Sequence, residues 1–355
     1  MNITLKNNSS GKEINGFHSL NVISITHVTS DSVMICFEIP TEIRSLYSFK
    51  PGQHVELLLY EGNEELRRTY SICSGANEPL SIGVKALKSG KVSSFLNSAI
   101  SVGDEILVSQ PRGSFVLNTA AKNIAFFGAG SGITPLLSMM KTWNETSINS
   151  TLIYGNKVLR SIMFRDEIDQ LADRVYHFLS GEKKEGFGYG LVNRENISEL
   201  IINDRSLIDA DAFYICGPAS MIADVRETLQ SFGVSDDLIH FEYFSAPLEN
   251  KSSDQATLPS FSGNCKVQVK LEGDKFQFDV SADGSVLLEA ARKAGLEAPF
   301  SCKTGICGSC RAKIKNGTVS MKANYALTAE EVEQGYILTC QAQPTCSDLS
   351  ISFDD

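Results

Sequence analysis

Nine cysteines occur in the chain, and four of them lie between residues 302 and 340. Cys302, Cys307 and Cys310 are separated by four and by two residues, and Cys340 follows after another 29. In a chain whose N-terminus has no secretion-signal pattern, such crowding favours metal ligation over disulfide bonds. Four thiolates at this spacing are typical of a cage around two iron ions, so we expect a 2Fe-2S cluster near the C-terminus.

A zinc site is the competing interpretation of these cysteines. Zinc sites usually pair two short Cys-x2-Cys segments, but Cys340 has only Cys346 nearby, at the wrong separation. A loop around two irons must also turn tightly and bring backbone N–H groups close to sulfur, which suits Gly305 and Gly308. We therefore assign the cluster to Cys302, Cys307, Cys310 and Cys340, and interpret Cys36, Cys73, Cys265 and Cys346 as ordinary small residues.

The pattern of residues changes along the 355-residue chain, which is longer than one ordinary domain. From residue 21 to 115, short β-branched and aromatic runs are separated by Gly, Pro and polar turns, which predicts an antiparallel β-barrel with one helix near residues 92–97. After residue 122, strands alternate with helices, which predicts an α/β domain with a doubly wound parallel sheet. The stretch 249–262, rich in Ser, Asn, Asp and Pro, is interpreted as a linker.

The part of the chain after this stretch has a third pattern. Strands are expected at 266–271, 275–280, 312–314, 337–340 and 349–353, with a helix that begins at Val286 and ends before Gly295. The Cys-rich loop follows this helix, and the fourth cysteine comes from the distant strand that ends at residue 340. We therefore expect an α+β unit that closes the cluster cage with a strand.

Two segments of the expected barrel carry residues that suit a flavin. A flavin needs an aromatic face against its ring, a donor for the ring edge, and a cation with helix N-terminal N–H groups for its pyrophosphate. Tyr70 offers a ring, Ser71 a hydroxyl and Arg68 a charge, and a helix starts after Gly90. Most strand tyrosines only pack a core, so each element alone is weak, and their order in the chain strengthens the hypothesis. The candidate residues are Arg68, Thr69, Tyr70, Ser71, Gly90, Lys91, Val92 and Ser93.

A glycine-rich turn after the strand at 124–127 suits a dinucleotide. Glycines between a strand and a helix let the backbone approach a pyrophosphate, and the helix presents its positive end. A second segment, 216–218, follows another strand, and its Cys216 is either a nicotinamide neighbour or a small buried residue. Phe244 is either an aromatic near the flavin or an apolar residue that packs inward. The candidate residues are Gly128, Gly130, Gly132, Thr134, Pro135, Cys216, Gly217, Pro218 and Phe244.

The choice between the two nicotinamide dinucleotides depends on residues after the second strand of the α/β domain. An acid there would hold the ribose hydroxyl of NADH, whereas basic residues would suit the 2′-phosphate of NADPH. Residues 154–157 are followed by Arg160 and Arg165, with no acid near the end of that strand. We therefore expect NADPH, with NADH as the alternative.

Residues 264–354 resemble a plant-type ferredoxin throughout, in the segments 286–291, 299–302 and 335–340. The barrel segments, with Pro111-x-Gly113-x-Phe115, resemble the flavin domain of the ferredoxin-NADP reductase superfamily, which implies FAD, with FMN as the alternative. The order of the parts resembles the reductase components of multicomponent oxygenases over residues 16–355. This resemblance implies a FAD-binding β-barrel at 16–118, an NAD(P)-binding α/β domain at 119–248, the linker at 249–262 and a β-grasp-like 2Fe-2S domain at 263–355.

The resemblance also implies an activity. Hydride would pass from NAD(P)H to FAD beside Ser71 and Cys216, and single electrons would then pass through the cluster to an oxygenase of the phenylacetyl-CoA epoxidase or steroid hydroxylase kind. Two alternatives stay open. One is a reductase for another acceptor, such as a hybrid-cluster protein or a desaturase, and the other is a redox sensor that binds the same cofactors.

Composition narrows the possible partners. The net charge of −10 argues against a nucleic-acid surface, which would need clustered Lys and Arg. Residues 121–262 carry 12 basic and 19 acidic residues, so a solvated helical face or an acidic docking surface is expected there. No segment approaches the roughly 18 apolar residues of a membrane span, and we expect a cytoplasmic protein.

Overall fold

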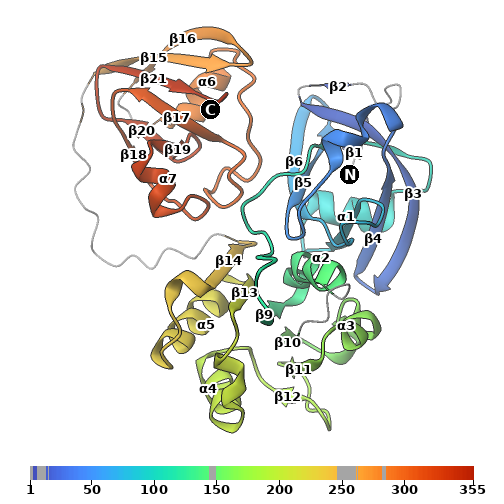
Figure 1. Cartoon of the computed structure of the whole chain (residues 1–355). Helices are drawn as coiled ribbons and strands as arrows, with labels where there is room; N and C mark the ends of the chain where they lie inside the picture. The colour runs from blue at the N-terminus through green and yellow to red at the C-terminus, as the bar shows by residue number, and fades with distance from the viewer. Residues whose placement is uncertain are drawn as a thin grey trace. The chain divides into compact units, whose positions relative to one another are not determined.

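A computed structural model describes residues 3–5, 13–14, 16–143, 149–245, 261, 263–281 and 285–355 (Figure 1). The chain divides into two compact units, Met1–Ser245 and Ala246–Asp355. The linker expected at 249–262 lies outside the described residues except for Phe261. Within the described ranges, no helix has the length and apolar character needed to cross a bilayer.

The first part of the larger unit is the antiparallel barrel that the sequence predicts. Its strands pair in the order β1-β5-β8-β3-β4-β7, with β6 added to β5. A bridge between Ile72 and Ile82 brings the end of β6 to β7 and closes the barrel. Side chains such as Ile35, Leu57 and Val108 fill its core. The elements are β1 (Ile3–Thr4), β2 (Glu13–Ile14), β3 (Phe17–Thr29), β4 (Ser32–Glu38), η1 (Thr41–Tyr47), β5 (His54–Glu61), β6 (Glu64–Ser71), β7 (Ser81–Lys85), α1 (Lys91–Ser98) and β8 (Glu105–Ser109).

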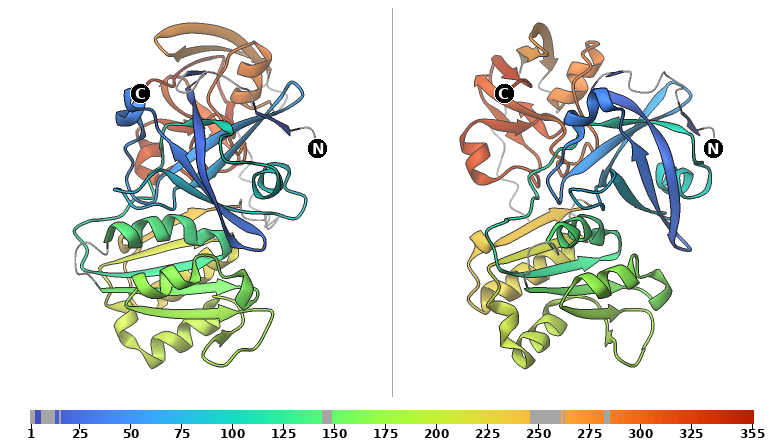
Figure 2. Two further views of the ribbon diagram at one scale, coloured as in Figure 1. Left: turned by 90° about the vertical axis from the view of Figure 1, so that its right-hand side faces the viewer. Right: turned by 45° about the vertical axis from the view of Figure 1, so that its right-hand side comes forward.

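The second part of the larger unit is a six-stranded parallel sheet in the order β12-β11-β10-β9-β13-β14. Helices lie on both faces, as Figure 2 shows. Alternate strand residues therefore enter two different cores: Phe126 packs with α2 and α3, and Phe127 packs with α4 and α5. The elements are β9 (Asn123–Ala129), η2 (Gly130–Gly132), α2 (Ile133–Trp143), β10 (Asn149–Asn156), η4 (Leu159–Ser161), α3 (Arg165–Leu171), β11 (Arg174–Leu179), β12 (Gly188–Tyr189), α4 (Arg194–Asn203), η5 (Arg205–Ile208), β13 (Ala212–Gly217), α5 (Ala219–Ser231), η6 (Asp236–Leu238) and β14 (Ile239–Tyr243).

Barrel and parallel sheet pack together along a seam within this unit. The seam leaves no room for a side chain at Gly83 of β7. A Cβ there would lie 2.6 Å from Thr134 Cγ2 and 3.3 Å from the Phe164 ring. Ser138 of α2 donates a hydrogen bond of 2.6 Å to the carbonyl of Ser74. These contacts join the two parts through buried groups.

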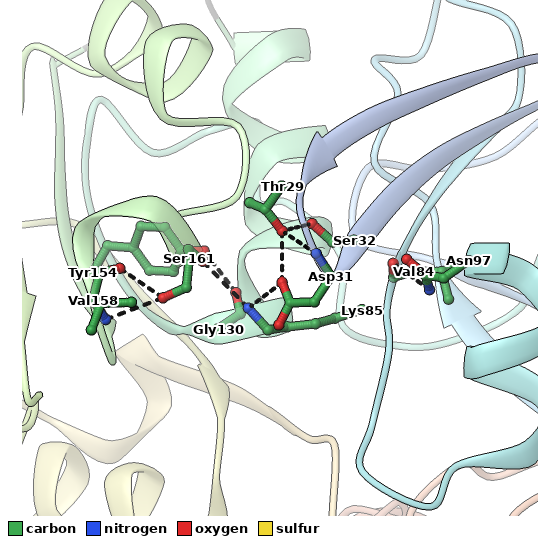
Figure 3. A network of polar contacts seen from close by, with 10 residues as sticks. All are labelled: Thr29, Asp31, Ser32, Val84, Lys85, Asn97, Gly130, Tyr154, Val158 and Ser161. Carbon is green, nitrogen blue, oxygen red and sulfur yellow. Dashed lines mark hydrogen bonds and ion pairs between the residues drawn. The ribbon is translucent and has the colours of Figure 1, made fainter.

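A polar network also joins the two parts (Figure 3). Lys85 Nζ donates to the carbonyl of Ser161 at 3.3 Å and lies 3.5 Å from Asp31 Oδ1. Asp31 belongs to the turn between β3 and β4, where Thr29 Oγ1 donates to its carboxylate. One lysine thus links two barrel segments to η4 of the parallel-sheet part.

The smaller unit is the expected α+β fold. Its five-stranded sheet has the order β16-β15-β21-β17-β19, and a separate pair is formed by β18 and β20. β15 and β21 pair in parallel, and the other neighbours in the five-stranded sheet are antiparallel. The elements are β15 (Asn264–Leu271), β16 (Asp274–Ser281), α6 (Leu287–Lys293), β17 (Arg311–Asn316), β18 (Val319–Met321), α7 (Ala329–Glu333), β19 (Tyr336–Leu338), β20 (Ala342–Pro344) and β21 (Asp348–Ser352).

One sequence expectation about this unit is wrong. The strand expected to end at residue 340 ends at Leu338, and Cys340 lies in the turn that follows. The turn is held by hydrogen bonds from Thr339 N to Cys310 O at 3.1 Å and from Gln341 N to Leu338 O at 2.9 Å. The turn directs the Cys340 thiol toward the Cys-rich loop.

The seam yields a stability prediction. We expect Gly83→Ala to lower the free energy of unfolding by about 1–3 kcal/mol, because its methyl group must displace Thr134 and Phe164. Thr134→Ser removes the crowding methyl, so the double variant should regain most of the loss. Urea unfolding followed by fluorescence of Trp143, the only tryptophan, would measure this. Equal losses with and without Thr134→Ser would contradict it.

Candidate functional site

The end of β6 places the expected flavin residues at one end of the barrel. Tyr70 lies opposite Val55 on β5 and packs against the barrel core, while the next residue, Ser71, is buried opposite His54. Burial raises the pKa of the Tyr70 phenol, and the positive charge of Arg68 partly offsets this, so Tyr70 stays a neutral ring. Arg68 is exposed and donates to the carbonyl of the preceding residue at 2.7 Å.

The start of α1 is tied to the same hairpin. Lys91 forms an ion pair with Glu61 at the end of β5, so its charge is already balanced and Arg68 is the freer cation. Ser93 Oγ accepts from the N–H of Leu87 at 3.1 Å and donates to Gly90 O at 3.3 Å. These bonds shape the turn before α1, whose first N–H groups are the kind that bind a pyrophosphate.

The glycine turn after β9 touches the end of β13. A Cβ on Gly132 would lie 2.1 Å from the carbonyl oxygen of Cys216, so no side chain fits there. Gly130 adopts the left-handed φ of +54°, and Tyr154 Oη donates to its carbonyl at 2.7 Å. Thr134 Oγ1 donates to Ser131 O at 2.9 Å and secures the first turn of α2.

This contact lies where the connections of the parallel sheet reverse direction. β9 is the central strand between β10 and β13, and α2 and α5 begin after the carboxyl ends of β9 and β13. In open α/β sheets, ligands bind at this switch point. The expected residues Gly128, Gly130, Gly132, Thr134, Pro135, Cys216, Gly217 and Pro218 all belong to these two strand ends or to the helix starts after them.

Cys216 is fully buried, and Glu242 lies beside it on β14. Burial raises the pKa of the Cys216 thiol well above its ordinary value, and the Glu242 carboxylate raises it further, so the group is a neutral thiol at physiological pH. The Nδ1 atom of His54 lies 3.6 Å from the Glu242 carboxylate. Neither His54 nor the carboxylate of Glu242 was singled out from the sequence, because only the pairing of distant strands brings them together.

Phe244 follows β14 and is 37% exposed. By contrast, Phe241 lies under Arg226, with 4.4 Å from the guanidinium carbon to the ring centre, and meets Tyr243 edge-on. The inward-packing role considered for this segment thus falls on Phe241. Phe244 is partly exposed, which suits stacking on another ring.

The turn after β10 contacts an acid that the sequence analysis missed. Glu182, which follows β11, accepts a hydrogen bond from the N–H of Leu159. The Arg165 side chain already contacts two other residues. Its Nε atom lies 3.7 Å from Asp169 Oδ2, and its guanidinium carbon lies 5.5 Å from the Phe187 ring centre. Of the two expected arginines Arg160 is the more exposed residue, and the premise that no acid lies nearby is wrong.

Four of the six cysteines of the smaller unit, Cys302, Cys307, Cys310 and Cys340, lie as two pairs. The thiols of Cys302 and Cys307 share a hydrogen bond, and so do those of Cys310 and Cys340. The bond from Cys307 lowers the pKa of Cys302 to about 4, and the same bond raises the pKa of Cys307. The bond between the other two thiols likewise lowers the pKa of Cys340 and raises that of Cys310.

Paired thiols suit two irons that each take two thiolates. In the described part of the chain, no three His, Cys, Asp or Glu side chains surround a single ion position. The loop turns through left-handed backbone at Lys303, Gly305 and Gly308, with φ of +59°, +83° and +71°. Backbone N–H groups point at sulfur: Thr304 N lies 3.4 Å from Cys302 Sγ, and Cys302 N lies 3.5 Å from Cys307 Sγ.

The other cysteines differ in their surroundings. Cys36, Cys73 and Cys265 are buried, and burial raises the pKa of Cys73 to about 12. Cys346 is half-buried and accepts a hydrogen bond from Thr318 N at 3.2 Å. Packing and local hydrogen bonds account for these four cysteines.

Comparisons with known families match all three parts of the chain. Residues 19–117 match the oxidoreductase FAD-binding domain, residues 126–227 the oxidoreductase NAD-binding domain, and residues 269–345 the 2Fe-2S iron-sulfur cluster binding domain. These matches confirm the three kinds of cofactor expected from the sequence, which are FAD, a nicotinamide dinucleotide and a 2Fe-2S cluster.

Curated relatives cover nearly the whole chain. One subunit of the 1,2-phenylacetyl-CoA epoxidase from Escherichia coli K12 is 35% identical over 95% of this chain and 98% of that protein. The ferredoxin reductase component of 3-ketosteroid-9-alpha-monooxygenase from Rhodococcus rhodochrous is 28% identical over 94% of this chain and 96% of that protein. Among solved structures, phthalate dioxygenase reductase shares the fold, with a TM-score of 0.61 and 24% identity over 96% of this chain and 98% of that one.

The paired thiols yield a test by ligand removal. We expect Cys310→Ser to reduce bound iron from about two ions per chain to nearly none, because it leaves Cys340 without its partner thiol. Cys346→Ser changes a cysteine outside the pairs and should keep the iron. Iron content and visible absorbance after anaerobic purification would measure both. Full iron retention in Cys310→Ser would contradict the assignment.

The Gly132 contact yields a second test. We expect Gly132→Ala to weaken dinucleotide binding about tenfold, since its methyl group costs about 1–3 kcal/mol by pushing the turn away from Cys216. Gly233→Asn is the control, because Gly233 follows α5 outside the assigned residues, a Cβ there meets no atom within 4 Å, and Asn tolerates left-handed backbone. Titration with NADPH and NADH would show whether only the first variant binds weakly.

Proposed function

Because the chain belongs to the family of oxygenase reductase components that join FAD-binding, NAD-binding and 2Fe-2S domains, we propose that its electron acceptor is the oxygenase component of an aryl-CoA epoxidase. The chain transfers electrons from NAD(P)H to an oxygenase, as its relatives do. The finer proposal rests on the 35% identity to the epoxidase subunit, against 28% to the ketosteroid relative.

The flavin roles follow the placement of residues at the barrel end. Tyr70 supplies the ring face, Ser71 the hydroxyl at the ring edge, and Arg68 the cation for the pyrophosphate. The start of α1 adds N–H groups, and Gly90 leaves room for Ser93, because a Cβ there would lie 2.5 Å from Ser93 Oγ. We assign Arg68, Thr69, Tyr70, Ser71, Gly90, Lys91, Val92 and Ser93 to FAD binding.

The dinucleotide roles follow the switch point of the sheet. The turn at Gly130–Gly132 and the start of α2 receive the pyrophosphate, while the Cys216–Gly217 backbone and the neutral thiol line the place for the nicotinamide. Phe244 keeps a ring available beside the flavin. When bound, FAD takes up the hydride and the 2Fe-2S cluster carries electrons singly. The chain's own contribution is to hold the two sites on one seam and to exclude water with buried Ser71 and Cys216.

We also propose the domain limits 16–118, 119–248 and 263–355, with 249–262 as the linker, and a cytoplasmic location. A reducing cytoplasm would keep the cysteines as thiols for iron. The four cluster ligands are Cys302, Cys307, Cys310 and Cys340.

An anaerobic titration tests the proposed function. NADPH should bleach the flavin absorbance and then produce the electron spin resonance signal of a reduced 2Fe-2S cluster. The purified oxygenase component of an aryl-CoA epoxidase should then be reduced at a rate that supports turnover. Rapid reduction of cytochrome c without reduction of any oxygenase would point to another acceptor, and failure to reduce cytochrome c would point to a sensor.

NADPH is the dinucleotide we propose, because Lys157 and Arg160 are exposed after β10. Arg160→Ala should lower kcat/KM for NADPH about tenfold and leave the NADH value within about twofold, since a charged hydrogen bond to phosphate contributes about 1.5–3 kcal/mol. Arg165→Ala is the matched control, because that side chain is held by Asp169 and Phe187. A wild-type preference for NADH would instead assign Glu182 to the ribose hydroxyl.

A further inference from the structure

A buried histidine and a glutamate meet across the seam of the larger unit. His54 is the first residue of β5 in the barrel and is 4% exposed, and Glu242 lies on β14 of the parallel sheet. Their nearest atoms, His54 Nδ1 and Glu242 Oε1, are 3.6 Å apart. In the described part of the chain, His54 Nδ1 and Glu242 Oε2 have no hydrogen-bond partner.

Strand register places this pair between the two residues assigned to hydride transfer. His54 lies directly opposite Ser71 across β5 and β6. Glu242 lies directly beside Cys216 across β13 and β14. The pair therefore connects the strand that carries the flavin hydroxyl with the strand end that receives the nicotinamide.

The chain also makes room for the imidazole. Gly113 has the left-handed φ of +118°, and a Cβ there would lie 3.0 Å from His54 Nδ1. Reciprocal backbone hydrogen bonds of 2.9 Å and 2.8 Å between His54 and Arg112 fix the segment against β5. The Nδ1 edge of the imidazole thus faces the Gly113 backbone and the Glu242 carboxylate.

Stability alone does not account for this arrangement. Burying a histidine and a carboxylate with unsatisfied polar atoms costs free energy, and apolar residues of similar size are often equally stable or more so. Buried ionisable groups of this kind are frequent at functional sites.

We propose that His54 is a positioning residue for hydride transfer: it holds the Glu242 carboxylate from the barrel side and so fixes the Cys216 strand end relative to Ser71. This inference rests on the proposed function. Neither group touches the reacting atoms in this role. The pair sets the separation of the two sites, on which hydride transfer depends steeply.

The test compares His54→Leu, His54→Asn, Glu242→Gln and the double variant His54→Leu/Glu242→Gln. Stopped-flow reduction of the FAD-loaded protein by NADPH gives a limiting rate and a dissociation constant. His54→Leu should lower the limiting rate about tenfold and change the dissociation constant less than about twofold. His54→Asn should restore most of the rate, because its amide can donate from nearly the position of Nδ1. The double variant should be no slower than the slower single variant, since the two residues act as one unit.

Two further measurements distinguish a positioning role of His54 from a general weakening of the seam. Ser138→Ala removes another buried seam hydrogen bond and should leave the limiting rate unchanged. In flavin-free protein, the urea midpoints of the single and double His54 and Glu242 variants should also show coupling rather than additivity. If His54→Leu does not fold, Glu242→Gln carries the test: it removes the charge that His54 faces and should lower the limiting rate about tenfold, and a wild-type rate would overturn the inference.

The outcomes that overturn the inference are distinct from failure of the proposed function. A wild-type limiting rate in His54→Leu, or rate losses that multiply independently in the double variant, would overturn the positioning role. If NADPH failed to reduce the wild-type flavin at all, the proposed function itself would fail.

Discussion

The contact between Gly132 and the carbonyl of Cys216 is the constraint on which the larger unit depends. Since a Cβ would lie 2.1 Å from that oxygen, the turn after β9 and the end of β13 meet backbone to backbone. This close approach brings two helix starts to one point at the reversal of the sheet. The same strand end carries Cys216 beside Glu242, and Glu242 faces the barrel through His54. A missing side chain thus sets how closely the turn after β9 approaches the end of β13.

The two units build their candidate sites by different physical means. In the larger unit the candidate residues lie on glycine turns, helix starts and a seam of packed side chains, in which Gly83 lets the barrel reach Thr134 and Phe164. In the smaller unit the thiols of Cys302, Cys307, Cys310 and Cys340 lie in two pairs, and the loop that carries the first three turns through left-handed backbone. The fold thus brings four possible metal ligands together before any metal binds.

The sequence predicted the three folds and most local motifs because these depend on short spacings. Cysteine spacing identified the cluster loop, and glycines after a strand identified the turn at Gly130–Gly132. What it missed depends on contacts between distant strands. Glu182, in the loop after β11, contacts the turn after β10. His54 and Glu242 lie on different sheets, and only the packing of the two sheets brings them together. The turn at Cys340 was predicted as strand, because the apolar run before it continues without a breaking residue. The turn is held by hydrogen bonds from Thr339 to Cys310 and from Gln341 to Leu338, and the first of these joins distant parts of the chain.

The parallel pairing of β15 with β21 has a consequence for biosynthesis. β15 is the first strand of the smaller unit to leave the ribosome, and the partner that completes its sheet is the last to be made. All four cluster cysteines are translated before that partner. The central sheet of the smaller unit therefore cannot close until the last cluster cysteine has been synthesised, so this unit completes its fold only at the end of translation.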